Sequence, residues 1–320
     1  MKYLKKIFKL VDNYVLARLQ NRPSTALFWY LPEPANIKNI GDLERYQNAS
    51  APFYLMDYRE KLSYSLENEE GIIVLPYDKP IGQQVNPEAA FQYALGLHDQ
   101  GCLTQFYKYA DYFVKAQSPE GLWAYDFDWF ASKKPWSSAL AQARGSSVML
   151  RAWLQSKEEK YREAAKLALG QFLLPTAEGG FLHRFAPENC LYFEEYPQTP
   201  TGVINGFMAS LMSIWELHFW LKEPWLSDLW TLGIASLEKM LPHYSTGWWS
   251  LYDLDEQTPV ANVNSPRYHF LEMHYLQVLS ILSSSKIVAD EYQNRCGQYN
   301  NVLFKTKALG LKVVRKVLYR

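Results

Sequence analysis

The sequence has 320 residues, with 33 Lys or Arg, 33 Asp or Glu, and 48% hydrophobic side chains. This length can bury one large core, and a formal charge of zero gives no basis for nucleic-acid binding, which depends on accumulated Lys and Arg. Cys102, Cys190 and Cys296 are far apart and form no CxxC pattern, which favours neither a zinc site nor a disulfide framework and indicates a reducing compartment.

The first 85 residues form the least regular part of the chain. Prolines interrupt them repeatedly, and residues 71–76 predict a short strand. Residues 2–20 carry apolar positions at helical spacing among several lysines, which predicts a basic amphipathic helix. We therefore expect an N-terminal arm with short β elements over residues 1–85, followed by one large domain over residues 86–320.

Beyond residue 85, apolar side chains recur at spacings of three and four, which predicts consecutive helices. The expected helices cover 88–99, 102–116, 138–155, 158–174, 203–221, 225–240, 269–283 and 288–297. They fall into pairs, separated at roughly 60-residue intervals by aromatic, Gly-led stretches at 121–126, 180–185 and 247–253. A helix pair cannot bury both of its faces alone, so neighbouring pairs should pack on one another. The pattern predicts a mainly α fold, although periodicity does not distinguish a closed barrel from an open solenoid.

The C-terminal segment, residues 301–320, carries six Lys or Arg and no acidic residue. Together with residues 2–20, it is a candidate for peripheral contact with an anionic membrane surface. The alternative is that each segment docks its apolar stripe on the domain and exposes its charges. No run of 18 apolar residues occurs, so no spanning segment is expected. We expect a cytoplasmic protein, with the inner face of the membrane as the place where the basic ends would act.

The most informative motif joins two carboxylates, a tyrosine and a rigid turn to the start of a helix. It reads Glu194-Glu195-Tyr196-Pro197, then Gln198-Thr199-Pro200 and Gly202 to Phe207. Further blocks are Leu241 to Gly247, Ser250 to Leu254 and Tyr268-His269 downstream, and Trp136 to Gln142, Leu150 to Leu154 and Asn86-Pro87 with Phe91 to Leu95 upstream. In order and content these blocks resemble the D-glucuronyl C5-epimerase family over roughly residues 86–285.

The resemblance implies a fold and a reaction. The family's C-terminal domain is an (α/α) barrel, a toroid of helix hairpins, here with a small irregular, β-containing N-terminal region. The implied reaction converts D-glucuronate to L-iduronate in a heparosan-like chain by removing a proton from C5 and returning one to the opposite face. The family's animal members have a membrane anchor, so its absence here favours a bacterial member. No metal and no cofactor are expected.

The resemblance assigns proton transfer to Tyr196, Tyr252 and Tyr268, with Glu195 beside Tyr196. Ionising a tyrosine at pH 7 costs roughly 4 kcal/mol at its ordinary pKa, so a nearby cation would help. The candidate cations are Arg144, Arg267 and His269, with Arg184 as a weaker one.

Other residues are candidates for binding the sugar chain: Gln92, Trp136, Ser138, Gln142 and Asn205. For Ser138 and Asn205 the alternative role is helix capping. Trp136 would provide a stacking surface, and Gln92 should share a helix face with Glu88.

This chain departs from the family where sulfate contacts would be expected. Asp255 and Ser265 occupy positions where family members often have arginine, and Ala209 replaces a tyrosine. A non-sulfated, heparosan-like or chondroitin-like acidic polysaccharide is therefore the expected substrate. The resemblance also implies a homodimer.

Other readings of the same residues remain. A polysaccharide lyase forms the same C5 carbanion and then expels the C4 oxygen. A glycoside hydrolase needs two carboxylates flanking the scissile bond, for which no motif is present. A non-catalytic glycan-binding protein is the last alternative.

Overall fold

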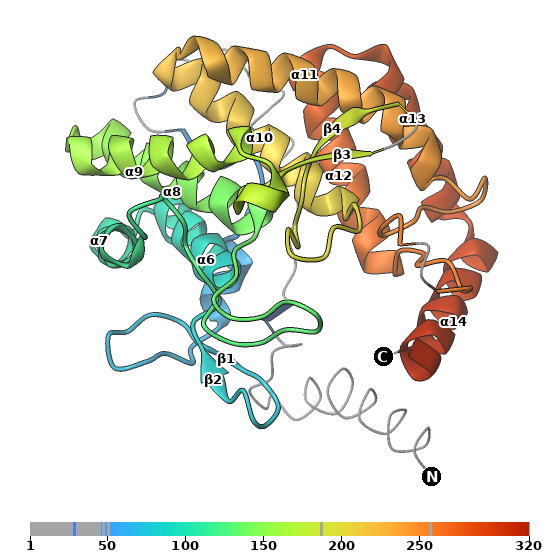
Figure 1. The fold of residues 1–320 in the computed structure, drawn as a ribbon, viewed down its shortest axis with the longest axis horizontal. Helices are drawn as coiled ribbons and strands as arrows, with labels where there is room; N and C mark the ends of the chain where they lie inside the picture. Colours follow the sequence, from blue (N-terminus) through green and yellow to red (C-terminus); the bar gives the residue numbers. More distant parts are fainter. Residues whose placement is uncertain are drawn as a thin grey trace. The chain divides into compact units, whose positions relative to one another are not determined.

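The computed structural model describes residues 28–29, 46, 49, 52–185, 188–255 and 258–319. Over these residues the chain is mainly helical, as predicted, with short two-stranded sheets (Figure 1). It divides into two compact units: the described residues before 138 with Val148–Ala165, and Ser138–Ser147 with the chain from Lys166 onward. The predicted helix at residues 2–20 lies outside the described residues. The predicted boundary between residues 85 and 86 stays a prediction.

The first unit contains one helix pair and a small sheet. Helix α6 (Pro87–Gln100) packs against α7 (Leu103–Ala116) and the 3-10 helix η2 (Arg59–Ser63). Strands β1 (Leu75–Pro76) and β2 (Gln83–Gln84) pair antiparallel, so the short strand predicted at residues 71–76 is confirmed at its end. Helices α8 (Ala139–Ser156) and α9 (Glu159–Gly170) each contribute residues to both units.

Helix α6 shows how local sequence fixes helix ends in this chain. The Asn86 side chain accepts a hydrogen bond from the Ala89 N–H at 3.0 Å, and Pro87 occupies the first helical position. Gly101 ends the helix with a left-handed φ of 79°. The helix predicted over 88–99 is therefore confirmed, and Asn86-Pro87 is its start signal.

The second unit is built mainly from helices α10 (Ile204–Leu221), α11 (Pro224–Met240), α12 (Pro266–Ser283) and α13 (Lys286–Asn300). Helix α10 packs on α11 and on α12, and α12 packs on α13. The 3-10 helices η3 (Gln171–Leu173) and η4 (Thr176–Glu178) follow α9, and η5 (Leu241–Tyr244) follows α11. The predicted pairing of consecutive helices is confirmed for α10 with α11 and for α12 with α13. Closure of the pairs into a barrel stays a prediction.

A β-hairpin precedes α10. Strands β3 (Leu182–Phe185) and β4 (Cys190–Phe193) pair antiparallel, with Leu182 opposite Phe193 and Phe185 opposite Cys190. All of β4 is buried, and α11 packs against it. The 180–185 stretch, read from sequence as a turn between helix pairs, therefore forms a strand that leads into the Glu194 motif.

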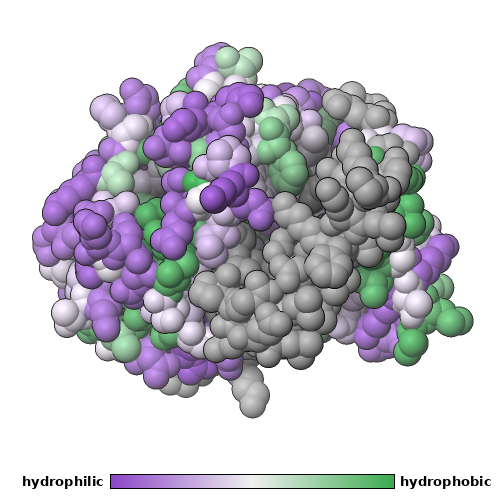
Figure 2. All heavy atoms as spheres, turned by 90° about the horizontal axis from the view of Figure 1, so that it is seen from below, coloured by the Kyte–Doolittle hydropathy of each residue, from purple (hydrophilic) through white to green (hydrophobic). Residues whose placement is uncertain are grey.

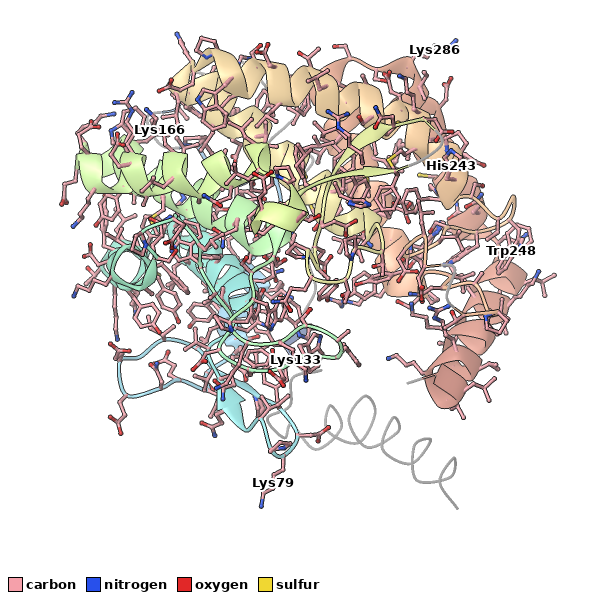
Figure 3. All side chains as sticks on the ribbon, in the orientation of Figure 1. Lys79, Lys133, Lys166, His243, Trp248 and Lys286 are labelled. Atoms are coloured by element: carbon pink, nitrogen blue, oxygen red, sulfur yellow. The ribbon has the colours of Figure 1, made fainter. Side chains whose placement is uncertain are left out.

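The last helix, α14 (Val302–Tyr319), docks on the loop between η5 and α12. Its Ala308 is fully buried with Trp249 and Val263, and Phe304 and Leu311 pack beside them. Trp248, labelled in Figure 3, lies against the same helix, with its ring centroid 5.8 Å from that of Phe304. Within the described part of the chain, no helix is both long and apolar enough to cross a membrane.

Candidate active site

The Glu194 motif is fixed by its backbone. The Glu194 N–H donates to the Phe181 carbonyl at 2.9 Å, and the Ala139 N–H donates to the Glu194 carbonyl at 3.2 Å. The motif therefore continues from the β3–β4 hairpin and meets the start of α8. Tyr196 follows, half-buried, and its carbonyl accepts from the Thr199 N–H at 2.9 Å, which makes the turn predicted around Pro197.

The Glu194 carboxyl group is fully buried and accepts hydrogen bonds from two backbone amides. The Gly202 N–H lies 3.2 Å and the Thr201 N–H 3.4 Å from its oxygens. Burial outweighs these bonds and raises the pKa of Glu194 to about 8. Gly202 has a φ of 66°, and a Cβ there would lie 2.9 Å from the Tyr244 Oη. A protonated carboxyl and an obligatory glycine thus hold the segment that leads into α10.

Glu195 packs against the first turn of α10. A Cβ added at Gly206 would lie 2.9 Å from the Glu195 Oε2 and 3.0 Å from its Cβ, so a larger residue there would require the Glu195 side chain to shift. Asn205, next to Gly206, is 4% exposed, and neither its Oδ1 nor its Nδ2 has a hydrogen-bond partner among the residues that the structure describes. The N-cap of α10 is Val203, so Asn205 does not cap the helix. Of the residues predicted from sequence, Glu195 therefore packs against Gly206, the residue that follows Asn205.

The second pair of predicted residues, Tyr252 and Tyr268, is in ring contact. Their centroids lie 5.2 Å apart with the rings at 81°. The Tyr252 N–H donates to the Asn262 carbonyl at 2.7 Å, and the Ile204 N–H donates to the Tyr252 carbonyl at 3.3 Å. Because Ile204 adjoins Asn205, the same backbone contact joins the tyrosine pair to the start of α10.

Tyr268 lies in the first turn of α12, not before the helix as the sequence suggested. Ser265 is the N-cap, and its side chain accepts from the Tyr268 N–H at 3.3 Å, while Pro266 begins the helix. The two tyrosines are both half-buried. Arg267, the residue before Tyr268, is also half-buried and shares this turn.

His269 has a different setting from the one expected. It is fully buried, stacked 3.8 Å from the Trp249 ring, with Nδ1 at 2.7 Å from Ser250 Oγ and Nε2 at 3.1 Å from the Arg295 carbonyl. Burial lowers the pKa of His269 to about 3. The ring is therefore neutral at pH 7, and the expectation that His269 supplies a positive charge does not hold in this structure.

Beneath the tyrosines lies a buried polar layer that the sequence did not reveal. Asn264 donates to Ser250 Oγ at 2.8 Å and to Glu272 Oε2 at 2.6 Å. Glu272 is fully buried, which raises its pKa to about 7, and Arg295 lies 3.7 Å from its other oxygen. This layer fixes the loop on which Tyr252 is carried.

Three further predicted residues lie at the start of α8, in the part that belongs to the second unit. Ser138, Gln142 and Arg144 are all buried, and Arg144 Nη2 donates to the Tyr275 Oη at 2.6 Å. Tyr275 lies on α12 seven residues after Tyr268, on the same face of the helix. Arg144 is therefore bound to the helix that carries one of the candidate tyrosines.

The remaining predicted residues, Gln92 and Trp136, belong to the first unit. Gln92 Nε2 donates to Glu88 Oε1 at 2.7 Å, which confirms that the two share a helix face. Trp136 is 6% exposed, and Tyr125 stacks on its ring at 4.0 Å. One face of this indole is thus already covered, and its role as a sugar platform stays a prediction.

A metal site is not indicated by the residues described. No group of three or more His, Cys, Asp or Glu side chains among them is arranged to hold an ion. The chemistry available in this region is that of tyrosine hydroxyls, carboxyl groups and amides.

The comparisons with known proteins point to the same region. A family described as "D-glucuronyl C5-epimerase C-terminus" matches residues 117–297. A D-glucuronyl C5-epimerase of Caenorhabditis elegans is 29% identical over 205 residues, covering 58% of this chain and 33% of the relative. An uncharacterised protein of Methanocaldococcus jannaschii is 29% identical over 163 residues, covering 49% of this chain and 51% of the relative. The chain thus spans about a third of one relative and half of the other. Since the family match covers more than half of the chain, this protein belongs to the D-glucuronyl C5-epimerase C-terminal family.

Proposed function

We propose that this protein is a uronate C5-epimerase that converts D-glucuronate to L-iduronate within an acidic polysaccharide. The observation that carries the proposal is the ring contact between Tyr252 and Tyr268, 5.2 Å between centroids, inside the family-matched region. The backbone contact from Tyr252 to Ile204 adds Glu195 and Asn205 to the same neighbourhood.

The proposed reaction needs two proton-transferring groups. One removes H5, and the electron pair left at C5 delocalises into the substrate carboxylate as an enediolate; the other returns a proton to the opposite face. We assign one face to Tyr268, with Tyr252 beside it, and the other to Tyr196 with Glu195. No electrons are gained or lost overall, so the proposal invokes neither a metal nor a redox cofactor.

Substrate binding is proposed for the polar residues that surround these groups: Ser138, Gln142, Arg144, Asn205 and Arg267. The buried, unpartnered amide of Asn205 supports this role best, since such an amide is costly unless a ligand completes its hydrogen bonds. Gln92 and Trp136 stay predictions, as do the (α/α) barrel, the homodimer and the preference for a non-sulfated, heparosan-like or chondroitin-like chain. His269 is proposed to act only through Ser250, which it positions.

The test is product analysis after incubation with heparosan and, separately, with non-sulfated chondroitin. Proton NMR distinguishes iduronate from glucuronate and also detects unsaturated chain ends. Iduronate without unsaturated ends is the expected result on at least one polymer. Unsaturated ends would assign the protein to the lyases, which form the same carbanion but break the C4–O bond. Binding of both polymers with neither product would make it a glycan-binding protein.

A further inference from the structure

A cation from outside the family-matched region reaches the candidate tyrosines. Lys312 lies on α14, beyond residue 297 where the family match ends. Its Nζ is 4.7 Å from the centroid of the Tyr252 ring. It donates to Asn262 Oδ1 at 2.7 Å, and the same residue's carbonyl accepts from the Tyr252 N–H. Lys312 therefore contacts the ring of Tyr252 and also binds Asn262, whose carbonyl accepts the hydrogen bond from the Tyr252 N–H.

Contacts with the loop hold the half-buried Lys312 side chain in place. Asn262 Nδ2 donates to Asp253 Oδ2 at 2.6 Å. Asp253 therefore fixes the side-chain amide of Asn262 that accepts the hydrogen bond from Lys312. One turn further along α14, Arg315 is 8% exposed, pairs with Asp255 at 2.8 Å and also donates to the Val260 carbonyl. Lys312 is half-buried between these contacts. Helix α14 is thus fastened to both sides of the loop that carries Tyr252.

The chemistry at C5 needs a positive charge close to the tyrosines, because negative charge grows on the substrate carboxylate as the proton leaves. The loop from Tyr252 to the start of α12 does not supply it, since its charged residues, Asp253, Asp255 and Glu256, are all acidic. Arg315 already pairs with Asp255 and neutralises it. Lys312 is the cation whose ammonium group lies over Tyr252 itself.

We propose that Lys312 binds the carboxylate of the uronate unit beside Tyr252. This inference rests on the proposed function, because it takes the substrate to be a uronate polymer acted on at Tyr252. An ammonium group acts as a compact point charge with rotatable donors, which suits a carboxylate whose charge spreads onto an enediolate during the reaction.

The chain offers a closely matched control. Lys305 lies seven residues earlier on α14, two turns away and on the same side of the helix, with its Nζ 3.7 Å from the Tyr299 ring centroid. Both lysines are half-buried and cover a tyrosine, but Tyr299 lies on α13 and stacks on His269, whereas Lys312 covers Tyr252 of the candidate pair. Lys312→Met and Lys305→Met therefore remove the same charge and the same kind of contact at different places.

Two measurements test the proposal on the full chain. The first is turnover of the polymer: Lys312→Met should lower kcat/KM by about tenfold to hundredfold, Lys312→Arg should restore part of it, and Lys305→Met should leave it within about twofold. The second is binding of native polymer against polymer whose carboxyl groups have been reduced to alcohols. Wild type should prefer the native polymer, and Lys312→Met, with a melting temperature like that of Lys305→Met, should lose the preference.

The outcomes separate this inference from the proposed function. Normal turnover by wild type with equal effects of the two lysine variants would overturn the role of Lys312 alone. Loss of turnover in Lys312→Met with the carboxylate preference intact would also overturn it, because Lys312 would then only hold the loop. A carboxylate preference that depends on Lys312 without any turnover would support the inference and overturn the epimerase. Wild type that neither binds nor converts a uronate polymer would overturn both.

Discussion

Asn205 combines burial with a side-chain amide that makes no hydrogen bond within the described structure, and we propose that this amide binds the substrate. Leaving a buried amide unsatisfied costs roughly 1–3 kcal/mol of folding free energy. Asn205 adjoins Gly206, and a Cβ at Gly206 would lie 2.9 Å from the Glu195 Oε2. A substitution of Asn205 should therefore change the stability and the activity of the protein in opposite directions.

Replacing Asn205 with Leu, which has a similar shape, should not lower the free energy of unfolding, and we expect a gain of about 1 kcal/mol. The same change should lower kcat/KM by at least tenfold, because it removes the amide that we propose contacts the sugar. Urea unfolding and polymer turnover measure the two effects. A variant that is destabilised by several kcal/mol, or that keeps full turnover, would show that the amide serves the fold.

Glu194 gives the second residue-scale prediction, on pH. Burial raises the pKa of Glu194 from 4.5 to about 8, so between these values the folded protein keeps a proton that the unfolded chain has released. The unfolded state then binds fewer protons, and stability falls as pH rises from about 4.5 to about 8. In Glu194→Gln this loss should be smaller by roughly 1–4 kcal/mol.

The measurement is the free energy of unfolding of wild type and Glu194→Gln across that pH range. Their difference should grow toward pH 8 and then level off. Glu178→Gln, at an exposed glutamate, is the control and should follow wild type throughout. A pH-independent difference for Glu194→Gln would mean that its carboxyl group is already ionised in the folded protein.

Some residue positions could be predicted from sequence and others could not, for physical reasons. The resemblance named Tyr252 and Tyr268 as separate candidates, and the structure adds that their rings are in contact. The sequence prediction put Tyr268 just before the helix. Ser265-Pro266 is a helix start signal that could have placed Tyr268 inside α12. The burial of His269 depends on its stack with Trp249, and the approach of Lys312 to Tyr252 depends on docking across the fold. Neither leaves a local signal in the chain.

At the scale of an element, the first turn of α10 is shaped by Glu195. Alanine normally stabilises a helix interior relative to glycine, by about 1 kcal/mol. At position 206 its Cβ would lie within 3.0 Å of the Glu195 side chain, which must then shift. We expect Gly206→Ala to lower kcat by tenfold or more, because a displaced carboxylate is misaligned for proton transfer.

Gly297→Ala is the matched control for that prediction. It lies inside α13, and nothing stands within 4 Å of an added Cβ. It should raise stability by about 0.5–1 kcal/mol and leave kcat unchanged. Equal activity of the two variants would show that the position of Glu195 is not critical to the reaction.

Helix α14 has a second face that its docking does not use. Its outward aliphatic side chains include Val302 at 72%, Leu303 at 78%, Leu309 at 54% and Val313 at 43% exposed, and no acidic residue occurs between residues 302 and 319. Figure 2 shows hydrophobic and hydrophilic side chains next to each other at the edge where Figure 1 places α14. From the sequence, docking of α14 on the domain and membrane contact by α14 were alternatives. Since different faces of the helix would serve each, the two are compatible.

The membrane contact predicted for the basic C-terminus can be tested with vesicles. Full-length protein should co-sediment with vesicles containing phosphatidylglycerol and not with pure phosphatidylcholine, and 0.5 M salt should weaken the binding. Leu309→Asp combined with Val313→Asp should reduce binding to anionic vesicles at least tenfold without changing polymer turnover. Equal binding of wild type and this variant would contradict the prediction.

The elements themselves were the most predictable part of the fold. Apolar spacings of three and four predicted the helices of residues 204–300 to within a few residues. The buried face of an amphipathic helix requires this spacing, so it can be read from the local sequence. The hairpin of β3 and β4 was not predicted, because β4 is buried along its whole length and so lacks the alternation that marks a half-exposed strand. The division of α8 and α9 between two units also has no counterpart in the sequence.

At the scale of the whole molecule, we propose that the second unit supplies the tyrosines and the carboxylate that transfer protons at C5. The most direct measurement is deuterium incorporation at C5 of heparosan in D2O, by wild type and by Tyr268→Phe. Wild type should place deuterium at C5 together with new iduronate, and Tyr268→Phe should lower the rate by about 10²–10⁴-fold with polymer affinity largely kept. Iduronate formed at an undiminished rate by Tyr268→Phe would contradict the account, as would a wild-type protein that binds the polymer and leaves every C5 proton in place.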